Sequence, residues 1–283
     1  ESVPHSTFMA PVERLRLLTI FIIGVAVAAI SLLVLLVSRI AMLPVRQLIN
    51  SVQQMSNGDM TSPVPEIPDK ELGMLANGFD VLRRQVSRSY DELRRGYIDL
   101  ARALVASLEA RDPYTAGHTE RVGQYALAVS RKLGLGEDDM DMIRRAAELH
   151  DIGKACVPDA VLLKPDRLTP GEFAEIMRHP GKSSEIVHHL EFLRDVVPLI
   201  EGHHERYDGG GYPKGLSGPD IPLGARILAV ADAYDAMTSK RAYRDALSHE
   251  KAIDILVEGA GSQWDATIVR AFLEMLEDRE TAA

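Results

Sequence analysis

The chain has 283 residues, 46% of them hydrophobic, which is enough apolar material for one or two folded domains. Its formal net charge is −9 without a dense stripe of lysine and arginine, so duplex nucleic acid is excluded as an expected partner. Aromatic residues make up 5% while alanine, leucine, valine and arginine are plentiful, and this favours an all-α fold. A small phosphorylated ligand remains compatible with the acidic charge, because a metal centre can supply positive charge locally.

An apolar run near the start predicts a transmembrane helix over 17–38. The run from Leu17 to Ser38 holds no charged residue and is long enough to cross a bilayer. The alternative is a very hydrophobic buried helix, but no other segment offers a comparable surface to pack against it. Residues 1–16 are then expected to be the remnant of an extracytoplasmic segment. Arginines flank the run on both sides, so the charges do not set its orientation.

Two amphipathic helices with an extended connector are predicted after the apolar run. Apolar residues at helical spacing follow Pro44 and continue to Met55, and the Asn57-Gly58-Asp59 triplet ends that helix. Three prolines between residues 63 and 68 favour an extended connector. A second helix opens at Glu71-Leu72, and its apolar spacing persists to about residue 110.

This order of elements resembles a HAMP linker, which we place at 39–92. The resemblance rests on the Pro44/Leu48 pair and on the Glu71-Leu72 start with Phe79. It implies a parallel four-helix coiled coil of two chains, and therefore a homodimer through HAMP and the adjoining helices. It also implies that the chain is held in a bacterial inner membrane, with everything after Ser38 cytoplasmic.

Five histidines and two aspartates lie at helix ends and glycine-rich breaks in the second half of the chain. A single such residue is usually part of a core, with its hydrogen bonds satisfied. Seven together are better explained as metal ligands, because imidazole and carboxylate suit iron, manganese, zinc, cobalt or nickel. Seven ligands exceed the needs of one ion, and a carboxylate such as Asp151 can bridge two. The set lacks a thiolate, which excludes a structural zinc finger. Its members are His118, His150, Asp151, His179, His203, His204 and Asp232.

The strings around these residues resemble the HD-GYP subgroup of the HD phosphohydrolase superfamily. His150-Asp151 followed by Gly153-Lys154 matches its HD motif, and the HHExxDGxGYP string from His203 to Pro213 matches its GYP motif. The order of the two strings is specific to this subgroup. Further matches are Asp159, Leu162, Leu168-Thr169, Ile221-Pro222, Ala225-Arg226-Ile227, Ala231-Asp232, Asp235-Ala236-Met237-Thr238 and Arg241-Ala242-Tyr243-Arg244.

The HD-GYP resemblance implies a helical-bundle phosphodiesterase domain over 93–283 that hydrolyses cyclic di-GMP. The seven residues above would bind the metals, expected to be iron or manganese. Asp151 and Lys154 would be catalytic, with Lys154 on the scissile phosphate, and the dinucleotide would be held by Lys154, Tyr212, Arg241 and Arg244. Some members have a glutamate four residues before the first histidine that helps bind a third metal. Tyr114 stands there in this chain, so two ions are expected.

The implied mechanism is in-line attack on phosphorus by a metal-bridging hydroxide, which gives linear pGpG first and GMP if a second cut follows. One alternative is an HD phosphohydrolase for another cyclic dinucleotide. A second is a non-catalytic cyclic di-GMP receptor that binds partners, such as diguanylate cyclase domains, through the GYP surface. Loss of a ligand would favour this second alternative, and none of the seven is missing.

Two other features are given structural interpretations. The His188-His189 doublet lacks the glycine-rich loop and the following glutamate of His203-His204, so we expect it on a helix surface or partly in the core. Cys156, the only cysteine, cannot form an internal disulfide, which fits a reducing compartment. We expect its side chain to be a small buried filler.

Overall fold

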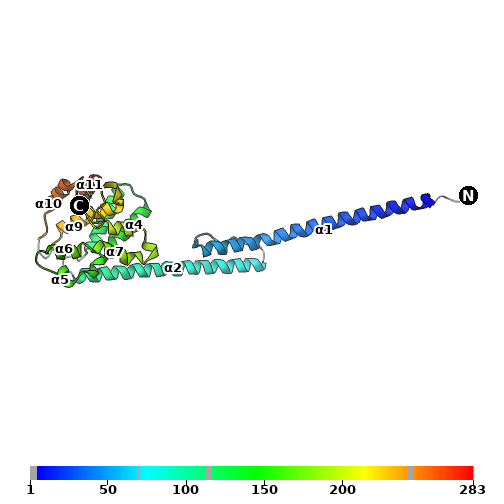
Figure 1. Cartoon of the computed structure of the whole chain (residues 1–283), viewed down its shortest axis with the longest axis horizontal. Coiled ribbons are helices and arrows are strands. Elements are labelled where there is room, and N and C mark those ends of the chain that lie inside the picture. Colours follow the sequence, from blue (N-terminus) through cyan, green and yellow to red (C-terminus); the bar gives the residue numbers. More distant parts are fainter. Residues whose placement is uncertain (1–4, 69, 112–116, 241–244, 283) are drawn as a thin grey trace. The chain divides into compact units, whose positions relative to one another are not determined.

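The computed structural model describes residues 5–68, 70–111, 117–240 and 245–282 (Figure 1). In these ranges all regular structure is helical, apart from one isolated bridge between Ala260 and Trp264. The predicted all-α class is therefore confirmed. The chain divides into two compact units, Glu1–Leu93 and Arg94–Ala283, and we describe each by itself.

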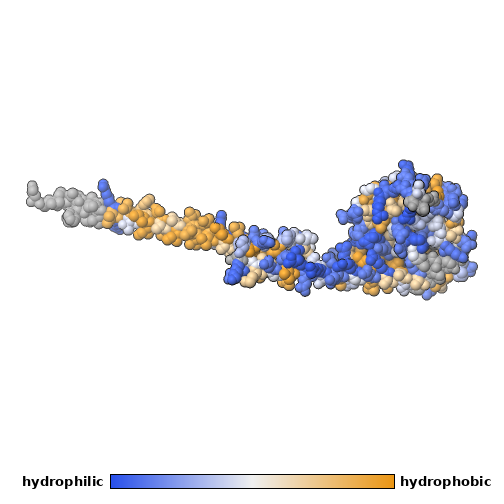
Figure 2. Space-filling model, turned by 180° about the vertical axis from the view of Figure 1, so that it is seen from behind, coloured by the Kyte–Doolittle hydropathy of each residue, from blue (hydrophilic) through white to orange (hydrophobic). Residues whose placement is uncertain are grey.

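The first unit begins with one long helix, α1 (His5–Ser56). It runs through Pro44 without a break, so the apolar run and the first amphipathic stretch form a single helix. Its apolar side chains between Leu15 and Leu43 are exposed, as the largely hydrophobic surface in Figure 2 shows. By length and composition this helix is able to cross a membrane.

The turn after α1 follows the predicted Asn57-Gly58-Asp59 stop. The carboxylate of Asp59 accepts hydrogen bonds from the backbone and the hydroxyl groups of both Thr61 and Ser62, which closes the turn. The proline-rich residues beyond it form no helix, and α2 (Lys70–Arg111) follows. A small core of Leu48, Ile67 and Ala76 joins the helices to the connector.

One face of α2 carries large apolar side chains that the single chain leaves exposed. Their spacing alternates between four and three residues, which is the pattern of a coiled-coil seam. Each is between 44% and 59% exposed. We call this set the α2 seam: Val86, Tyr90, Leu93, Tyr97, Leu100 and Leu104. Ala101 and Val105, on another face of the same helix, are buried in the core of the second unit.

The second unit is a bundle of short helices around α9, which packs against α3, α4, α8, α10 and α11. Most of the side chains of α9 are buried, as its alanine-rich sequence allows. The elements that follow α2 are α3 (His118–Lys132), α4 (Glu137–Leu149), η1 (Ile152–Cys156), α5 (Asp159–Leu162), α6 (Pro170–Ile176), α7 (His179–His188), η2 (Glu191–Leu193), α8 (Val197–Glu201), η3 (Gly218–Asp220), α9 (Leu223–Thr238), α10 (His249–Gly259) and α11 (Ala266–Ala282).

A very close contact joins η1 to α7. The backbone N–H of Gly153 donates to the Ser183 hydroxyl at 2.8 Å, and that hydroxyl donates to the His150 carbonyl at 2.7 Å. A Cβ on Gly153 would lie only 2.2 Å from the His179 carbonyl oxygen and 2.4 Å from the Ser183 nitrogen. The glycine therefore lets the segment after His150-Asp151 reach the start of α7.

We expect Gly153→Ala to lower the free energy of unfolding of the second unit by about 1–3 kcal/mol, because the added methyl group must push backbone apart. Gly181→Ala is the matched control, since Gly181 lies in α7 with open space around its Cα. Denaturant unfolding of both variants checks this. Equal stability of the two variants would contradict the close contact.

Candidate metal centre

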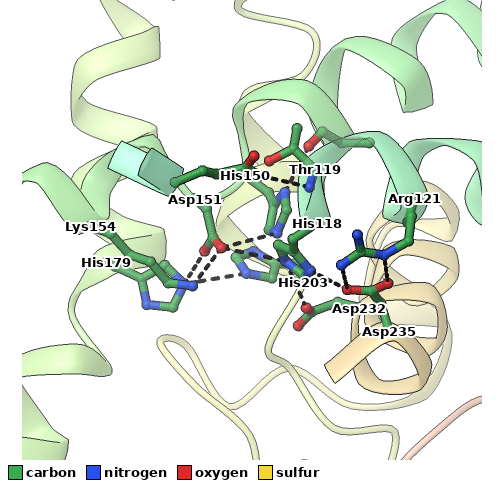
Figure 3. Close-up of polar contacts among 12 residues, drawn as sticks. His118, Thr119, Arg121, His150, Asp151, Lys154, His179, His203, Asp232 and Asp235 are labelled. Carbon is green, nitrogen blue, oxygen red and sulfur yellow. Dashed lines mark hydrogen bonds and ion pairs between the residues drawn. The ribbon is translucent and has the colours of Figure 1, made fainter. Parts of the chain in front are cut away.

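The seven predicted ligands come from several elements and meet in one largely buried place. Figure 3 labels all of them except His204. His118 is the first residue of α3, and His150 and Asp151 directly follow α4. His179 opens α7, His203 and His204 follow α8, and Asp232 lies on α9. The side chains of His118, His150, His179 and His203 are nearly inaccessible to solvent.

The ligand atoms form two separate groups of three, and a third group of His150, Asp151 and His203 overlaps both. The first group is His118, His150 and Asp232, and the second is His179, His203 and His204; within each group the atoms lie within 4.8 Å of one another. Asp151 lies between the groups. Its Oδ1 is 3.2 Å from His179 Nε2, and its Oδ2 is 3.4 Å from His150 Nε2. One carboxylate thus offers an oxygen to each group, as a bridging ligand must.

Three of the histidines are oriented by carbonyls at the ends of helices. The Nδ1 atoms of His150, His179 and His203 lie 2.7, 2.7 and 2.5 Å from the carbonyl oxygens three residues earlier, in the last turns of α4, α6 and α8. These carbonyls lack partners within their own helices. A carbonyl can only accept, so each Nδ1 carries the proton and each Nε2 presents its lone pair to the centre.

This arrangement fits a bound cation. The Nε2 atoms of His179 and His203 face each other at 3.4 Å, and because both rings are protonated at Nδ1, two lone pairs meet there. The buried Nε2 of His150 has no hydrogen-bond partner within the part of the chain that the structure describes. Two facing lone pairs and a buried nitrogen without a partner are both unfavourable in the absence of a ligand. A metal ion bound to these nitrogens would remove both costs.

His118 is oriented by a carboxylate instead of a carbonyl. Its Nδ1 lies 2.7 Å from Asp235 Oδ2, and its Nε2 lies 3.3 Å from Asp232 Oδ1, one turn earlier on α9. Arg121 holds Asp235 in turn, with its Nε 2.5 Å from Oδ1. Sequence reasoning matched Asp235 to the family but gave it no role, and it missed Arg121. The i, i+3 spacing of two aspartates on a largely apolar helix was the available signal.

At four of the candidate ligands the electrostatics set the protonation state that metal binding needs. His118 differs: burial lowers its pKa, but the hydrogen bond to Asp235 and the charges of Asp232 and Asp151 outweigh burial and raise it. Burial lowers the pKa of His150, lowers that of His203 well below its usual range and lowers that of His204 to about 3. Burial alone would raise the pKa of Asp151, but the Lys154 ammonium and the neighbouring histidines hold it well below its usual range. Neutral imidazoles and charged carboxylates are the forms that bind a divalent cation.

Of the residues predicted to bind the substrate, the structure describes Lys154 and Tyr212. Lys154 Nζ lies 2.5 Å from Asp151 Oδ2. The Lys154 side chain also lines a cavity beside the centre, whose other lining residues are Val105, Leu108, Glu109, His118, Thr119, Asp151 and Leu162. The Tyr212 ring lies 5.0 Å from the ring of His204. Arg241, Arg244 and Tyr114 lie outside the described residues.

The two structural interpretations have different outcomes. His188 and His189 are exposed at the end of α7, in agreement with the surface interpretation. The prediction for Cys156 was wrong, because its side chain is exposed. It is the last residue of η1, beyond the buried pair Ile152 and Gly153 that faces the core.

Comparisons with known proteins match both halves of the chain. Residues 102–268 match the HD domain family, and residues 36–88 match the HAMP domain family. A probable cyclic di-GMP phosphodiesterase of Vibrio cholerae is 38% identical over 71% of this chain and 49% of its own length. A cyclic di-GMP phosphodiesterase response regulator of Xanthomonas campestris is 39% identical over 68% of this chain and 51% of its own. A 3'3'-cGAMP-specific phosphodiesterase of Vibrio cholerae is 37% identical over 62% and 38%.

The chain spans about half the length of the first two relatives. The HD match alone covers more than half of the chain and contains all seven candidate ligands. A long apolar helix followed by a HAMP domain suggests membrane anchoring. The chain belongs to the HD domain family, carries the motifs of its HD-GYP subgroup and joins that domain to a HAMP domain.

Proposed function

We propose that this chain is a membrane-anchored signalling phosphodiesterase that hydrolyses cyclic di-GMP to linear pGpG, and GMP after a second cut. The observation that carries the proposal is the largely buried Asp151 carboxylate, which lies between two groups of ligand atoms with one oxygen toward each. The names of the Vibrio and Xanthomonas relatives support the reaction and the substrate.

Two divalent ions are proposed for the centre, one in each group, with Asp151 shared between them. The mixture of imidazole and carboxylate suits iron or manganese. When bound, such ions supply an acidified water as the nucleophile and positive charge opposite the phosphate oxygens.

Lys154 is the proposed contact for the scissile phosphate. Its ammonium lies at the cavity next to the bridging carboxylate and is about one quarter exposed, so a phosphate oxygen can reach it. A hydrogen bond from Nζ to a non-bridging oxygen would offset the charge that develops there. Tyr212, packed against His204, is proposed to hold a base or ribose at the edge of the site, and Arg241 and Arg244 are proposed to help hold the dinucleotide.

A second candidate substrate is another cyclic dinucleotide. The relative named as 3'3'-cGAMP-specific supports this alternative, since it matches the same domain at 37% identity. The geometry of the metal centre serves either substrate, because both contain the same scissile phosphodiester. Direct competition between the two dinucleotides decides between them.

We also propose that the chain acts as a homodimer in the bacterial inner membrane, with the HD domain in the cytoplasm. The HAMP match and the exposed α2 seam support pairing of two chains along α2. Diguanylate cyclase domains are proposed as additional partners of the GYP surface.

The first prediction concerns turnover. The chain, purified without oxygen and loaded with iron or manganese, should convert cyclic di-GMP to linear pGpG, as product chromatography measures. Asp151→Ala should lower turnover at least about 100-fold, because both metal groups lose their shared ligand. Chelation should abolish turnover, and returning the metal should restore it.

If the metal-loaded protein binds cyclic di-GMP without cleaving it, the proposed phosphodiesterase activity is contradicted and a receptor function is supported. Faster cleavage of 3'3'-cGAMP than of cyclic di-GMP would show that 3'3'-cGAMP is the preferred substrate of the two. Equal turnover by wild type and Asp151→Ala would contradict the site itself.

The second prediction concerns metal content. His203→Ala/His204→Ala should reduce the bound metal from about two ions per chain to about one, because the second group would retain only His179 beside Asp151. His188→Ala/His189→Ala is the matched control, since it removes an adjacent histidine pair that is exposed. Elemental analysis after dialysis measures both. Equal losses in the two variants would contradict the assignment.

The third prediction concerns the dimer. Leu93→Glu/Leu100→Glu should weaken self-association at least about tenfold, because two apolar seam residues become charged. Arg88→Glu changes the charge on the same helix outside the α2 seam and should leave association unchanged. Light scattering of detergent-solubilised chains across a concentration series measures this. A wild-type chain that is monomeric throughout would contradict the pairing.

A further inference from the structure

The N-terminus of α3 is not capped by its own residues. The first N–H groups of a helix lack partners within the helix, and a serine, threonine, aspartate or asparagine usually supplies one. Here the N-cap residue is Gly117, which has φ of +69° and no side chain to offer. The first turn of α3 must therefore obtain its hydrogen-bond acceptor from elsewhere, and His118 lies in that turn.

Glu109, in the last turn of α2, supplies the acceptor. Its Oε2 accepts from the Gly117 N–H at 3.1 Å, and its Oε1 accepts from the Thr119 N–H at 2.8 Å. These two N–H groups flank His118 on both sides. The interaction is charge-assisted and lies at the positive end of the α3 dipole, which strengthens it.

His118 is thus held at two points. Asp235 holds the imidazole through Nδ1, and Glu109 holds the backbone on either side of the residue (Figure 3 shows Thr119 beside it). Glu109 and the buried Val105 lie on the part of α2 that lines the cavity next to the centre. A turn or shift of this end of α2 therefore acts on the backbone at His118 through the two Glu109 hydrogen bonds.

We propose that Glu109 is a positioning residue, which ties the first metal group to α2 and transmits movement of that helix to His118. The inference rests on the proposed function for the role of the metals. The second group is held by residues on α7 and after α8, so it does not depend on Glu109. Movement of α2 is therefore expected to change the position of a ligand in the first metal group and to leave the second metal group unchanged.

A simple cap would have a different consequence. If Glu109 only stabilised α3, its removal would lower the stability of the chain and leave metal affinity unchanged. If Glu109 positions His118, its removal also lowers the affinity of the first group for its metal ion. Metal affinity measured on folded protein separates the two roles.

The experiment compares wild type, Glu109→Ala and Glu109→Gln in the full chain, solubilised in detergent, with Mn²⁺ as the probe. Equilibrium dialysis gives the ions bound per chain and their affinities, and thermal unfolding without metal gives stability. Glu120→Ala is the matched control, because it removes an exposed carboxylate from the same first turn of α3.

In Glu109→Ala, one Mn²⁺ should bind at least about tenfold more weakly, as is usual when a residue behind a metal ligand is lost, and the other ion should be unchanged. Glu109→Gln keeps one acceptor oxygen and should show a smaller loss. Glu120→Ala should bind as wild type does. If Glu109→Ala fails to fold, Glu109→Gln gives the decisive affinity.

Wild-type affinity for both ions in the folded Glu109 variants would overturn the inference, whatever their stability. An equal loss in Glu120→Ala would also overturn it. The dialysis requires no turnover, so a wild-type chain that binds two ions and cleaves no dinucleotide removes the proposed function and leaves this inference standing.

Transmission through α2 has its own test. One alanine inserted between Ser89 and Tyr90 turns the two parts of α2 by about 100° relative to each other. In the wild-type background it should change Mn²⁺ affinity about threefold or more, and in Glu109→Ala it should have little further effect, because coupled changes are not additive. Additive changes would contradict transmission through Glu109.

Discussion

The candidate site of the second unit is organised around the negative charge of the Asp151 carboxylate, whose side chain is only 11% exposed. Burial of an ionised carboxylate is costly unless positive charge and hydrogen-bond donors compensate it. Lys154 supplies one positive charge at 2.5 Å, which lowers the pKa of Asp151. The neutral forms of His150, His203 and His204 cannot supply the rest. The fold thus brings together a site whose charge is balanced when cations are bound.

Backbone groups that a helical bundle must satisfy anyway are used to orient this site. Every helix ends with carbonyls that lack partners, and the short helices α4, α6 and α8 provide three such ends within a small volume. Each end receives the Nδ1 proton of one candidate ligand histidine. A bundle of a few long helices would offer fewer ends, which gives a physical reason for the many short elements between α4 and α9.

The sequence predicted the parts of the site that are local in the chain. His150-Asp151 at a helix end and His203-His204 before a glycine-rich loop could be recognised because ligand, helix end and loop are contiguous. Asp235, Arg121 and Glu109 could not be assigned in this way, because their partners are far away in sequence or are backbone N–H groups without a residue-type signal. The exposure of Cys156 depends on which side of η1 faces the core, which its neighbours in the chain do not reveal.

The two faces of α2 have a practical consequence for where the second unit can be cut from the rest of the chain. The HD match begins at residue 102, in the middle of α2, whereas the compact unit begins at Arg94. A fragment that started at residue 102 would keep Val105 and Glu109 but would lose Ala101 from the core and most of the α2 seam. Its α2 helix would also begin about one turn before Val105, which lines the cavity beside the candidate metal centre, and would lack the earlier turns of the helix. The boundary of the family match is therefore not a boundary of folding.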